Sequence, residues 1–371
     1  MKAIFCFFIV VTSVVSGQLT IKVKGELPAD VFETSGLIFY NDKLITHNDS
    51  GNSAQLFEID TVSRAITRRV TITNVTNIDW EDITQDDTHI YIGDIGNNKG
   101  AREDLSVYRI LKADYISSEE VTAERIDFAY EDQSSFTSDN NSDWDAEALF
   151  VYENQLIILT KQWGSGGTVA YSLPKTPGDY QAKKLDGFNV NGLVTGATYN
   201  KEMELLYIVG YSRFLDPFIV RTNKLTASSI FGGETEKFAV TSPFGQVESI
   251  THVGENNYFL TSEAFKRDTP SIDYKSLLFS LKTMDSKEKE EEEEESLILF
   301  RSVGSNSLEY ELKTNETILA RAIYDASGRQ IRFTEAIKIE ESKIDISTLN
   351  SAIYYLTFYL RSGVVSKAFI R

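Results

Sequence analysis

The stretch from Asp79 to Ile95 reads DWEDITQDDTHIYIGDI, and its pattern recurs along the chain. An acidic or small residue is followed two positions later by an apolar one, then by a polar turn and a second apolar strand. The pattern starts at five places, spaced by 46, 66, 49 and 52 residues: Ser35-Gly36-Leu37, Glu81-Asp82-Ile83, Glu147-Ala148-Leu149, Gly196-Ala197-Thr198 and Glu248-Ser249-Ile250. The chain therefore contains five similar units.

Each unit continues with further short strands. The second strands are KLITHND, HIYIGDI, QLIILTK, LLYIVGY and NYFLTSE, and the third are AQLFEID, LSVYRIL, TVAYSLP, PFIVRTN and SLLFSLK. A fourth strand is visible in AITRRVTI and ERIDFAY. Repeats of about 50 residues with four short strands are typical of β-propeller blades. We expect an all-β protein with a propeller of five blades, or of six if the 66-residue interval holds extra strands. A β-sandwich with loops is the alternative.

The N-terminal strand is expected to close the ring. The fifth unit has no fourth strand after SLLFSLK, whereas the alternating segment QLTIKVK at 18–24 has no partner in its own unit. If the two pair, no long sheet edge stays open. The predicted propeller spans residues 18–284.

Composition excludes several classes of protein. The 42% of hydrophobic residues is ample for a packed core, which excludes a wholly disordered chain. The 37 basic and 55 acidic residues give a net charge of −18. Nucleic acid is therefore not expected as a partner, because phosphate binding needs clustered Lys and Arg.

The first 17 residues are predicted to be a signal peptide. Lys2 precedes the apolar run Ala3–Val15, and Val15-Ser16-Gly17 supplies a cleavage site before Gln18. The run is short for a bilayer span, so we expect no transmembrane segment in the mature chain; an uncleaved anchor helix is the alternative. The sole cysteine, Cys6, lies in this segment. The sequence thus predicts a secreted or outer-surface protein without disulfides.

A charged segment separates the propeller from a second domain. Residues 285–296 read DSKEKEEEEEES, which favours a solvated linker over a calcium-capturing tract. Residues 297–371 then alternate apolar and polar side chains, with a turn at Ala326-Ser327-Gly328. This pattern predicts a compact β-sandwich of about seven short strands.

Parts of both domains resemble known families. The segments Ala322–Arg329, Ile344–Leu349, Ile353–Leu356 and Ser366–Arg371 resemble the C-terminal sorting domain of the type IX secretion system of the Bacteroidetes. The resemblance implies that residues 297–371 bind the type IX secretion machinery and carry the protein across the outer membrane. An ordinary accessory β-domain is the alternative. The segments Asp79–Ile83 and Asp145–Leu149 are weakly similar to secreted bacterial propellers of the esterase-like phytase type, which implies architecture more than activity.

Carboxylates recur at the starts of the first strands: Asp79, Glu81, Asp145, Glu147 and Glu248. Because the first strand of each blade lines the central channel of a propeller, these groups should converge, and converging like charges need a proton, a basic partner or a metal. Oxygen ligands without cysteine favour Ca²⁺ or Mg²⁺. The sequence predicts a divalent-cation site with calcium as the candidate cofactor. The alternative is that each carboxylate caps backbone N–H groups or pairs with Lys and Arg.

Two polar loops, 46–52 and 93–100, follow the second strands of their units. They predict a ligand-binding rim, with later units contributing an aromatic ring and a cation that suit a glycan or an anionic group. The rim residues are Asn48, Asp49, Asp94, Asn97, Trp163 and Arg213. Ordinary tight turns are the alternative.

No catalytic residue is assigned, because the three histidines lie in different units and no G-x-S-x-G motif occurs. Two hypotheses therefore stand. The first is an exported propeller that binds an unidentified extracellular ligand without turnover. The second is a divalent-metal-dependent extracellular hydrolase that acts on a phosphoester, an ester or a glycan.

Overall fold

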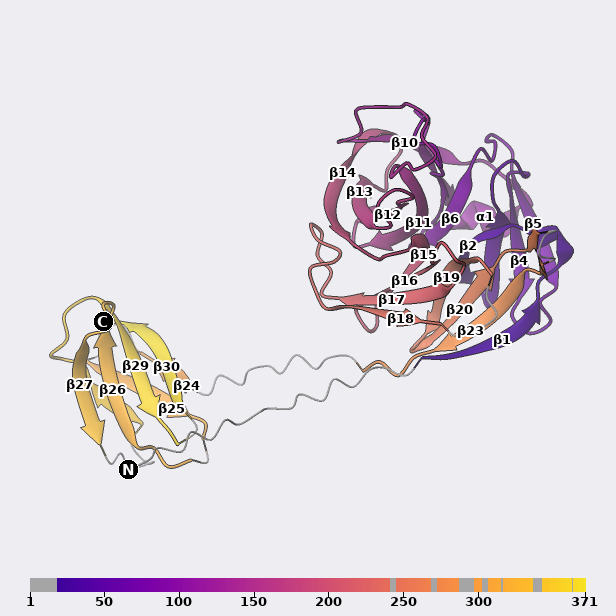
Figure 1. Ribbon diagram of the computed structural model, residues 1–371. Coiled ribbons are helices and arrows are strands. Elements are labelled where there is room, and N and C mark those ends of the chain that lie inside the picture. The colour runs from indigo at the N-terminus through magenta and orange to yellow at the C-terminus, as the bar shows by residue number, and fades with distance from the viewer. Residues whose placement is uncertain are drawn as a thin grey trace, which may run out of the picture. The chain divides into compact units, whose positions relative to one another are not determined.

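The structure is a computed structural model that describes residues 19–240, 245–267, 272–286, 297–301, 306–314, 316–335, 342–361 and 363–371 (Figure 1). The chain divides into two compact units, Met1–Lys287 and Glu288–Arg371. The predicted signal peptide, with Cys6, and most of the predicted linker lie outside the described residues. In the part of the chain that is described, no helix has the length and hydrophobicity to cross a membrane.

In its described residues, the first unit is a β-propeller of five four-stranded blades. From inner to outer strand, the first three blades are β2(Thr34–Tyr40), β3(Lys43–Asn48), β4(Gln55–Asp60), β5(Ile66–Ile72); β6(Trp80–Gln85), β7(His89–Asp94), β8(Ser106–Leu111), β10(Glu124–Tyr130); and β11(Asp145–Tyr152), β12(Gln155–Lys161), β13(Thr168–Pro174), β14(Gly178–Phe188). The last two are β15(Leu193–Asn200), β16(Leu205–Tyr211), β17(Pro217–Asn223), β18(Thr235–Ala239); and β19(Val247–Gly254), β20(Asn257–Ser262), β23(Leu277–Lys282), β1(Thr20–Glu26). The inner strands β2, β6, β11, β15 and β19 pack in a closed cycle.

The N-terminal strand closes the ring as the sequence predicts. Strand β1 pairs antiparallel with β23, placing Ile21 opposite Leu281 and Val23 opposite Phe279 (Figure 1). A short hairpin, β21(Phe265–Arg267) and β22(Ile272–Tyr274), lies between β20 and β23 in the chain. The sandwich alternative for this part of the chain is therefore wrong.

The long second interval does not hold a sixth blade. It contains α1(Lys112–Ser117) and β9(Glu120–Val121), and β9 pairs in parallel with the outer strand β5 of the first blade. Strand β10 in turn pairs in parallel with β14, which joins the second and third blades at their outer edges. The additional residues thus connect neighbouring blades, so the six-blade alternative is wrong.

Every inner strand carries a β-bulge near its start. The bulge leaves one residue without a cross-strand partner: Glu81, Glu147, Thr195 and Glu248 in the last four blades, and the Gly36-Leu37 region in the first. The pattern placed the fourth unit at Gly196, but the residue equivalent to Glu81 is Thr195, one position earlier. A bulge changes the direction of the extra residue's side chain, which here leaves the regular alternation between the two faces of the sheet.

The residue at or directly after each bulge is small in four blades: Gly36, Ala148, Gly196 and Ser249. At the two glycines, the backbone of the next inner strand lies close by. A Cβ on Gly36 would lie 2.6 Å from the backbone nitrogen of Ile83. The fifth is Asp82, whose buried carboxylate accepts hydrogen bonds from the backbone N–H groups of Ile83 (2.8 Å) and Leu149 (2.7 Å). Asp82 thus links the second blade to the third.

The second unit is the predicted β-sandwich of seven strands in its described residues. One sheet has the order β24(Leu297–Phe300), β25(Ser307–Leu312), β28(Lys343–Asp345), and the other β27(Gln330–Glu335), β26(Ala320–Asp325), β29(Ile353–Tyr359), β30(Val364–Ile370). Its own core includes Leu308, Ile323, Leu356 and Phe358. The unit therefore has the internal packing of a separate domain.

Close packing at the axis predicts a large cost for Gly36→Ala. Gly36 has a φ of +64°, and its Cβ would meet the backbone of the next blade. Gly51 is a matched control, since its φ is +73° and nothing lies within 4 Å of its Cβ position. Both substitutions incur the positive-φ penalty of about 1 kcal/mol. We expect Gly36→Ala to lose about 2 kcal/mol more than Gly51→Ala in urea unfolding. Equal losses would contradict close packing at the axis.

Candidate functional site

Carboxyl groups from four blades gather around one region of the propeller. Asp49 follows β3, Asp79 and Glu81 lie at the start of β6, Asp145 and Glu147 on β11, and Glu248 and Glu263 at β19 and after β20. Repulsion from another of these groups contributes to a raised pKa at six of them: Asp49, Asp79, Glu81, Glu147, Glu248 and Glu263. We call these seven groups the acidic cluster. It includes all five carboxylates that the sequence proposes as metal ligands.

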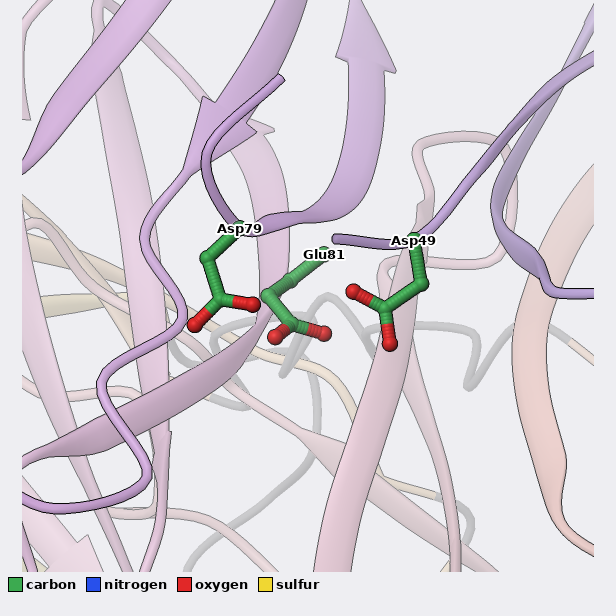
Figure 2. A group of neighbouring side chains, drawn as sticks. All are labelled: Asp49, Asp79 and Glu81. Atoms are coloured by element: carbon green, nitrogen blue, oxygen red, sulfur yellow. The ribbon is translucent and has the colours of Figure 1, made fainter. Parts of the chain in front are cut away.

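Asp49, Asp79 and Glu81 form a first trio. One carboxylate oxygen from each lies within 4.8 Å of those of the other two, and Figure 2 shows the three carboxylates facing one another. Glu81 is 3% exposed, whereas Asp49 and Asp79 are half-buried. Among the described residues, no hydrogen-bond donor contacts the carboxylate of Asp79 or Glu81. In the described part of the chain, the carboxylate of Asp49 accepts one hydrogen bond, from the backbone N–H of Ser50.

A glycine allows the backbone to approach this trio. A Cβ on Gly96 would lie 2.3 Å from Oε1 of Glu81 and 2.4 Å from Oδ2 of Asp79. The backbone N–H of Gly96 donates to the carbonyl of Asp79 at 3.2 Å, which holds the loop after β7 in this position. Any larger residue would fill the space beside the two carboxylates.

Glu81, Asp145 and Glu147 form a second trio, again with one oxygen each within 4.8 Å of the others. Here two of the three carboxylates, those of Asp145 and Glu147, have partners. Asp145 accepts hydrogen bonds from the backbone N–H groups of Asn97 (2.6 Å) and Ala146 (3.1 Å) and from Nε1 of Trp163 (2.8 Å). Glu147 forms an ion pair with Lys161. The sequence left open that these carboxylates cap backbone N–H groups or pair with basic side chains instead of binding a metal. The contacts of Asp145 and Glu147 are of this kind.

Lys161 is the cation inside the acidic cluster. Its side chain is 5% exposed and that of Glu147 is 7% exposed. The ammonium also donates to the hydroxyl of Tyr211 at 3.2 Å and lies 4.9 Å from the ring centroid of Trp163. Burial alone would lower the pKa of Lys161, but Glu147, Tyr211 and Glu248 raise it above its usual value. The lysine therefore carries its charge.

One lysine cannot balance seven carboxyl groups. Burial, followed by repulsion from Asp49 and Asp145, raises the pKa of Asp79 to about 7. Burial and like-charge neighbours raise the pKa of Glu263 to about 7, and raise that of Glu81 well above its usual range. Without a further cation, these groups bind protons near neutral pH.

The residues predicted for the ligand rim lie in four kinds of place. Asp49 belongs to the first trio. Asn48, Asp94 and Asn97 are buried: Asn48 donates to the carbonyl of Asp30 (2.8 Å), Asp94 pairs with Arg102 (2.8 Å), and the side-chain oxygen of Asn97 accepts from the N–H of Arg102 (2.9 Å). Trp163 contacts the second trio through Asp145, and Arg213 is exposed on the turn between β16 and β17.

Sequence reasoning missed Lys161, Tyr211 and Glu263 as members of this site. All three are the last residue of a quoted second-strand segment, in QLIILTK, LLYIVGY and NYFLTSE. The equivalent residue in KLITHND is Asp49. Comparing the last position of the five segments would have identified these polar residues.

No family model matches the chain, and no curated protein matches it. Several solved structures are similar. The PQQ-bound aldose sugar dehydrogenase of Streptomyces coelicolor has 10% identity and a TM-score of 0.44, covering 72% of this chain and 99% of that one. A putative oxidoreductase (glucose dehydrogenase) of Thermus thermophilus has 10% identity and a TM-score of 0.40, with coverages of 71% and 100%. The β-propeller domain of Cps50 (Swd1) from Myceliophthora thermophila has 9% identity and a TM-score of 0.36, with coverages of 70% and 99%. Similarity this low carries no argument about activity.

The raised pKa values predict that stability falls with pH when no divalent cation is present. Between pH 6.5 and 8.5, the folded chain releases protons from Asp79 and Glu263, whose pKa is about 7, whereas the unfolded carboxyls lost theirs near pH 4. The folded state therefore binds more protons at pH 6.5, and the free energy of unfolding decreases as pH rises. Urea unfolding in EDTA measures this, and Asp79→Asn should reduce the slope.

The range starts at pH 6.5 because His47 acts in the opposite direction below it. Burial lowers the pKa of His47 to about 4, so its contribution to stability rises with pH, most steeply below about 6.5, and levels off once the imidazole of the unfolded chain has lost its proton. Stability that stays constant or increases from pH 6.5 to 8.5 would show that the acidic cluster holds no excess protons.

Proposed function

We propose that the propeller binds a divalent cation, Ca²⁺ foremost, at the first trio of Asp49, Asp79 and Glu81. The observation that supports this most strongly is the carboxylate of Glu81, which is almost fully buried, has no hydrogen-bond donor among the described residues, and faces two further carboxylates. A buried, unpaired carboxylate costs several kcal/mol, and a cation removes that cost.

The donor set fits calcium. All three ligands are carboxylate oxygens, the type that Ca²⁺ prefers, and Ca²⁺–oxygen distances of about 2.4 Å allow ligand oxygens up to about 4.8 Å apart. The separations in the trio meet this limit. Asp49 and Asp79 are half-buried, so the remaining coordination positions of the ion would face solvent.

We propose that these open positions bind an extracellular ligand rather than serve turnover. An ion with free coordination sites attracts anionic or hydroxyl-rich molecules, such as a phosphate ester or a glycan. The second candidate is the divalent-metal-dependent hydrolase, favoured by the same open positions, because a bound phosphoester or ester oxygen would be polarised there. Release of product from a phosphoester or ester, lost in the Glu81→Gln variant, would favour the hydrolase.

The proposal includes export. The resemblance of residues 297–371 to type IX sorting domains supports recognition by that secretion machinery and a location outside the cell. The separate core of the second unit is consistent with a tail that is handled independently of the propeller. In this function the propeller is the binding module and the sandwich its sorting domain.

Calcium should stabilise the folded protein. Millimolar Ca²⁺ is expected to raise the melting temperature by a few degrees, corresponding to about 1–2 kcal/mol, because a ligand that binds only the folded state stabilises it. The double variant Asp79→Asn, Glu81→Gln should lose this shift and be at least as stable as the native chain in EDTA, since repulsion is relieved. Glu124→Gln, which removes an exposed carboxylate paired with Arg109, is the control and should keep the shift.

Differential scanning fluorimetry in EDTA and in Ca²⁺ distinguishes the outcomes by sign. If the double variant is strongly destabilised in EDTA, then Asp79 and Glu81 make stabilising contacts of their own. If the native chain shows no shift in Ca²⁺, Mg²⁺ or Mn²⁺, the first trio does not bind a divalent cation.

Deleting residues 297–371 should keep the protein inside the cell envelope. The propeller has its own closed ring of blades, so the truncated chain should fold and accumulate in the periplasm of a host with a type IX system. Cell fractionation of native and truncated chains measures this. Efficient release of the truncated chain would show that the sandwich is not a sorting domain.

A further inference from the structure

The two trios share Glu81, so the acidic cluster contains two adjacent cation positions. In each trio, three carboxylate oxygens lie within 4.8 Å of one another. Glu81 is central to both and is buried without a donor among the described residues. This is the arrangement of a two-cation centre in which one carboxylate bridges the ions.

A cation that belongs to the chain lies beside the second position and forms an ion pair with one of its three carboxylates, that of Glu147. Lys161 ends β12, directly opposite Asp145 in the register of β11 and β12. Its ammonium pairs with Glu147 and interacts electrostatically with Asp145 as well. The rings of Trp163 and Tyr211 lie 4.9 and 5.3 Å from the ammonium nitrogen and enclose it. The side chain is therefore held at the second trio and does not extend to solvent.

The first position has no equivalent of Lys161 among the described residues. The nearby arginine, Arg102, pairs with Asp94 at 2.8 Å and with Asp104 at 3.0 Å, and acts on Asp79 only as a neighbouring charge. Both trios consist of carboxylates whose oxygens lie within 4.8 Å of one another. They differ because a lysine of the chain, Lys161, lies beside the second trio, whereas no basic side chain among the described residues pairs with the first. A single positive charge in the second trio also spares the first ion the repulsion of a second divalent ion nearby.

We propose that Lys161 takes the place of the second ion in a two-cation centre, so that the native chain binds one divalent cation and loss of the ammonium opens a second divalent-cation site at Glu81, Asp145 and Glu147. This rests on the proposed function of the first trio. The ligand class of the new site is a hard, oxygen-seeking cation such as Ca²⁺. Lys161 therefore determines the stoichiometry of the centre.

Isothermal titration of the full chain with Ca²⁺ tests this directly. The native chain should bind one ion, and Lys161→Met should bind two, because methionine has similar length and packs against Trp163 and Tyr211 without a charge. Adding Glu147→Gln to Lys161→Met removes a ligand of the second trio and should return the stoichiometry to one. Lys237→Met is the matched control, since Lys237 also lies against an aromatic ring, 4.0 Å from that of Phe218, and it should leave the stoichiometry at one.

The outcomes separate this inference from the proposed function. One ion in the native chain and one in folded Lys161→Met would overturn the inference and leave the first site standing. No ion in the native chain but one in Lys161→Met would overturn the first site and support the second. No ion in either chain would overturn both. Circular dichroism confirms folding, and if Lys161→Met does not fold, Lys161→Gln is titrated in its place with the same expected result.

Discussion

The close approach of five inner strands at one axis is the constraint on which the rest of this structure depends. Small residues such as Gly36 and Gly196 are required there, because a Cβ at either position would lie under 3 Å from backbone atoms of the next blade. The β-bulge beside this close approach leaves a residue of each inner strand without a cross-strand hydrogen-bonding partner, so its side chain can point in another direction. Three of these side chains are glutamates: Glu81, Glu147 and Glu248. Dense packing of backbone thus concentrates carboxylates in the same place.

Concentrated carboxylates need compensation, and the structure supplies it unevenly. Asp82 and Asp145 have backbone N–H donors, and Glu147 has Lys161. Such partners reduce the cost of burying a charge. Asp79 and Glu81 have no such partner among the described residues, although they lie in the same cluster. The contrast between neighbouring groups of the same chemical type, rather than the number of acidic residues, is what indicates a cation.

The sequence predicted those parts of the structure that depend on local pattern. The alternation of apolar and polar residues identified the strands, because side chains of a strand point to opposite faces with a period of two. The unpaired segment at 18–24 identified the closure by β1, because an open sheet edge is unfavourable. Lys161 and Glu263 were missed because only the starts of the first strands were searched for charged residues. Both residues end second strands, and antiparallel pairing brings them back to the level of those starts, with Lys161 opposite Asp145 and Glu263 bonded to Gln246. Asn48, Asp94 and Asn97 have the polarity of ligand-binding residues, but polarity alone does not distinguish a side chain that faces a ligand from one that holds a buried loop.

The cation that we propose for the first trio would also affect how the blades hold together. Hydrogen bonds between blades are spread around the ring. They include those of β5 with β9, β10 with β14, Asp82 with Leu149, and Thr195 Oγ1 with the carbonyl of Val247 at 2.6 Å. The ligands Asp49 and Asp79 come from the first and second blades, so an ion between them forms one more link of this kind, at the axis. If this ion keeps coordination positions toward solvent, as we propose, binding of a ligand there would be coupled to the packing of these two blades. In the proposed function, the site would therefore link recognition at the axis to the stability of the ring.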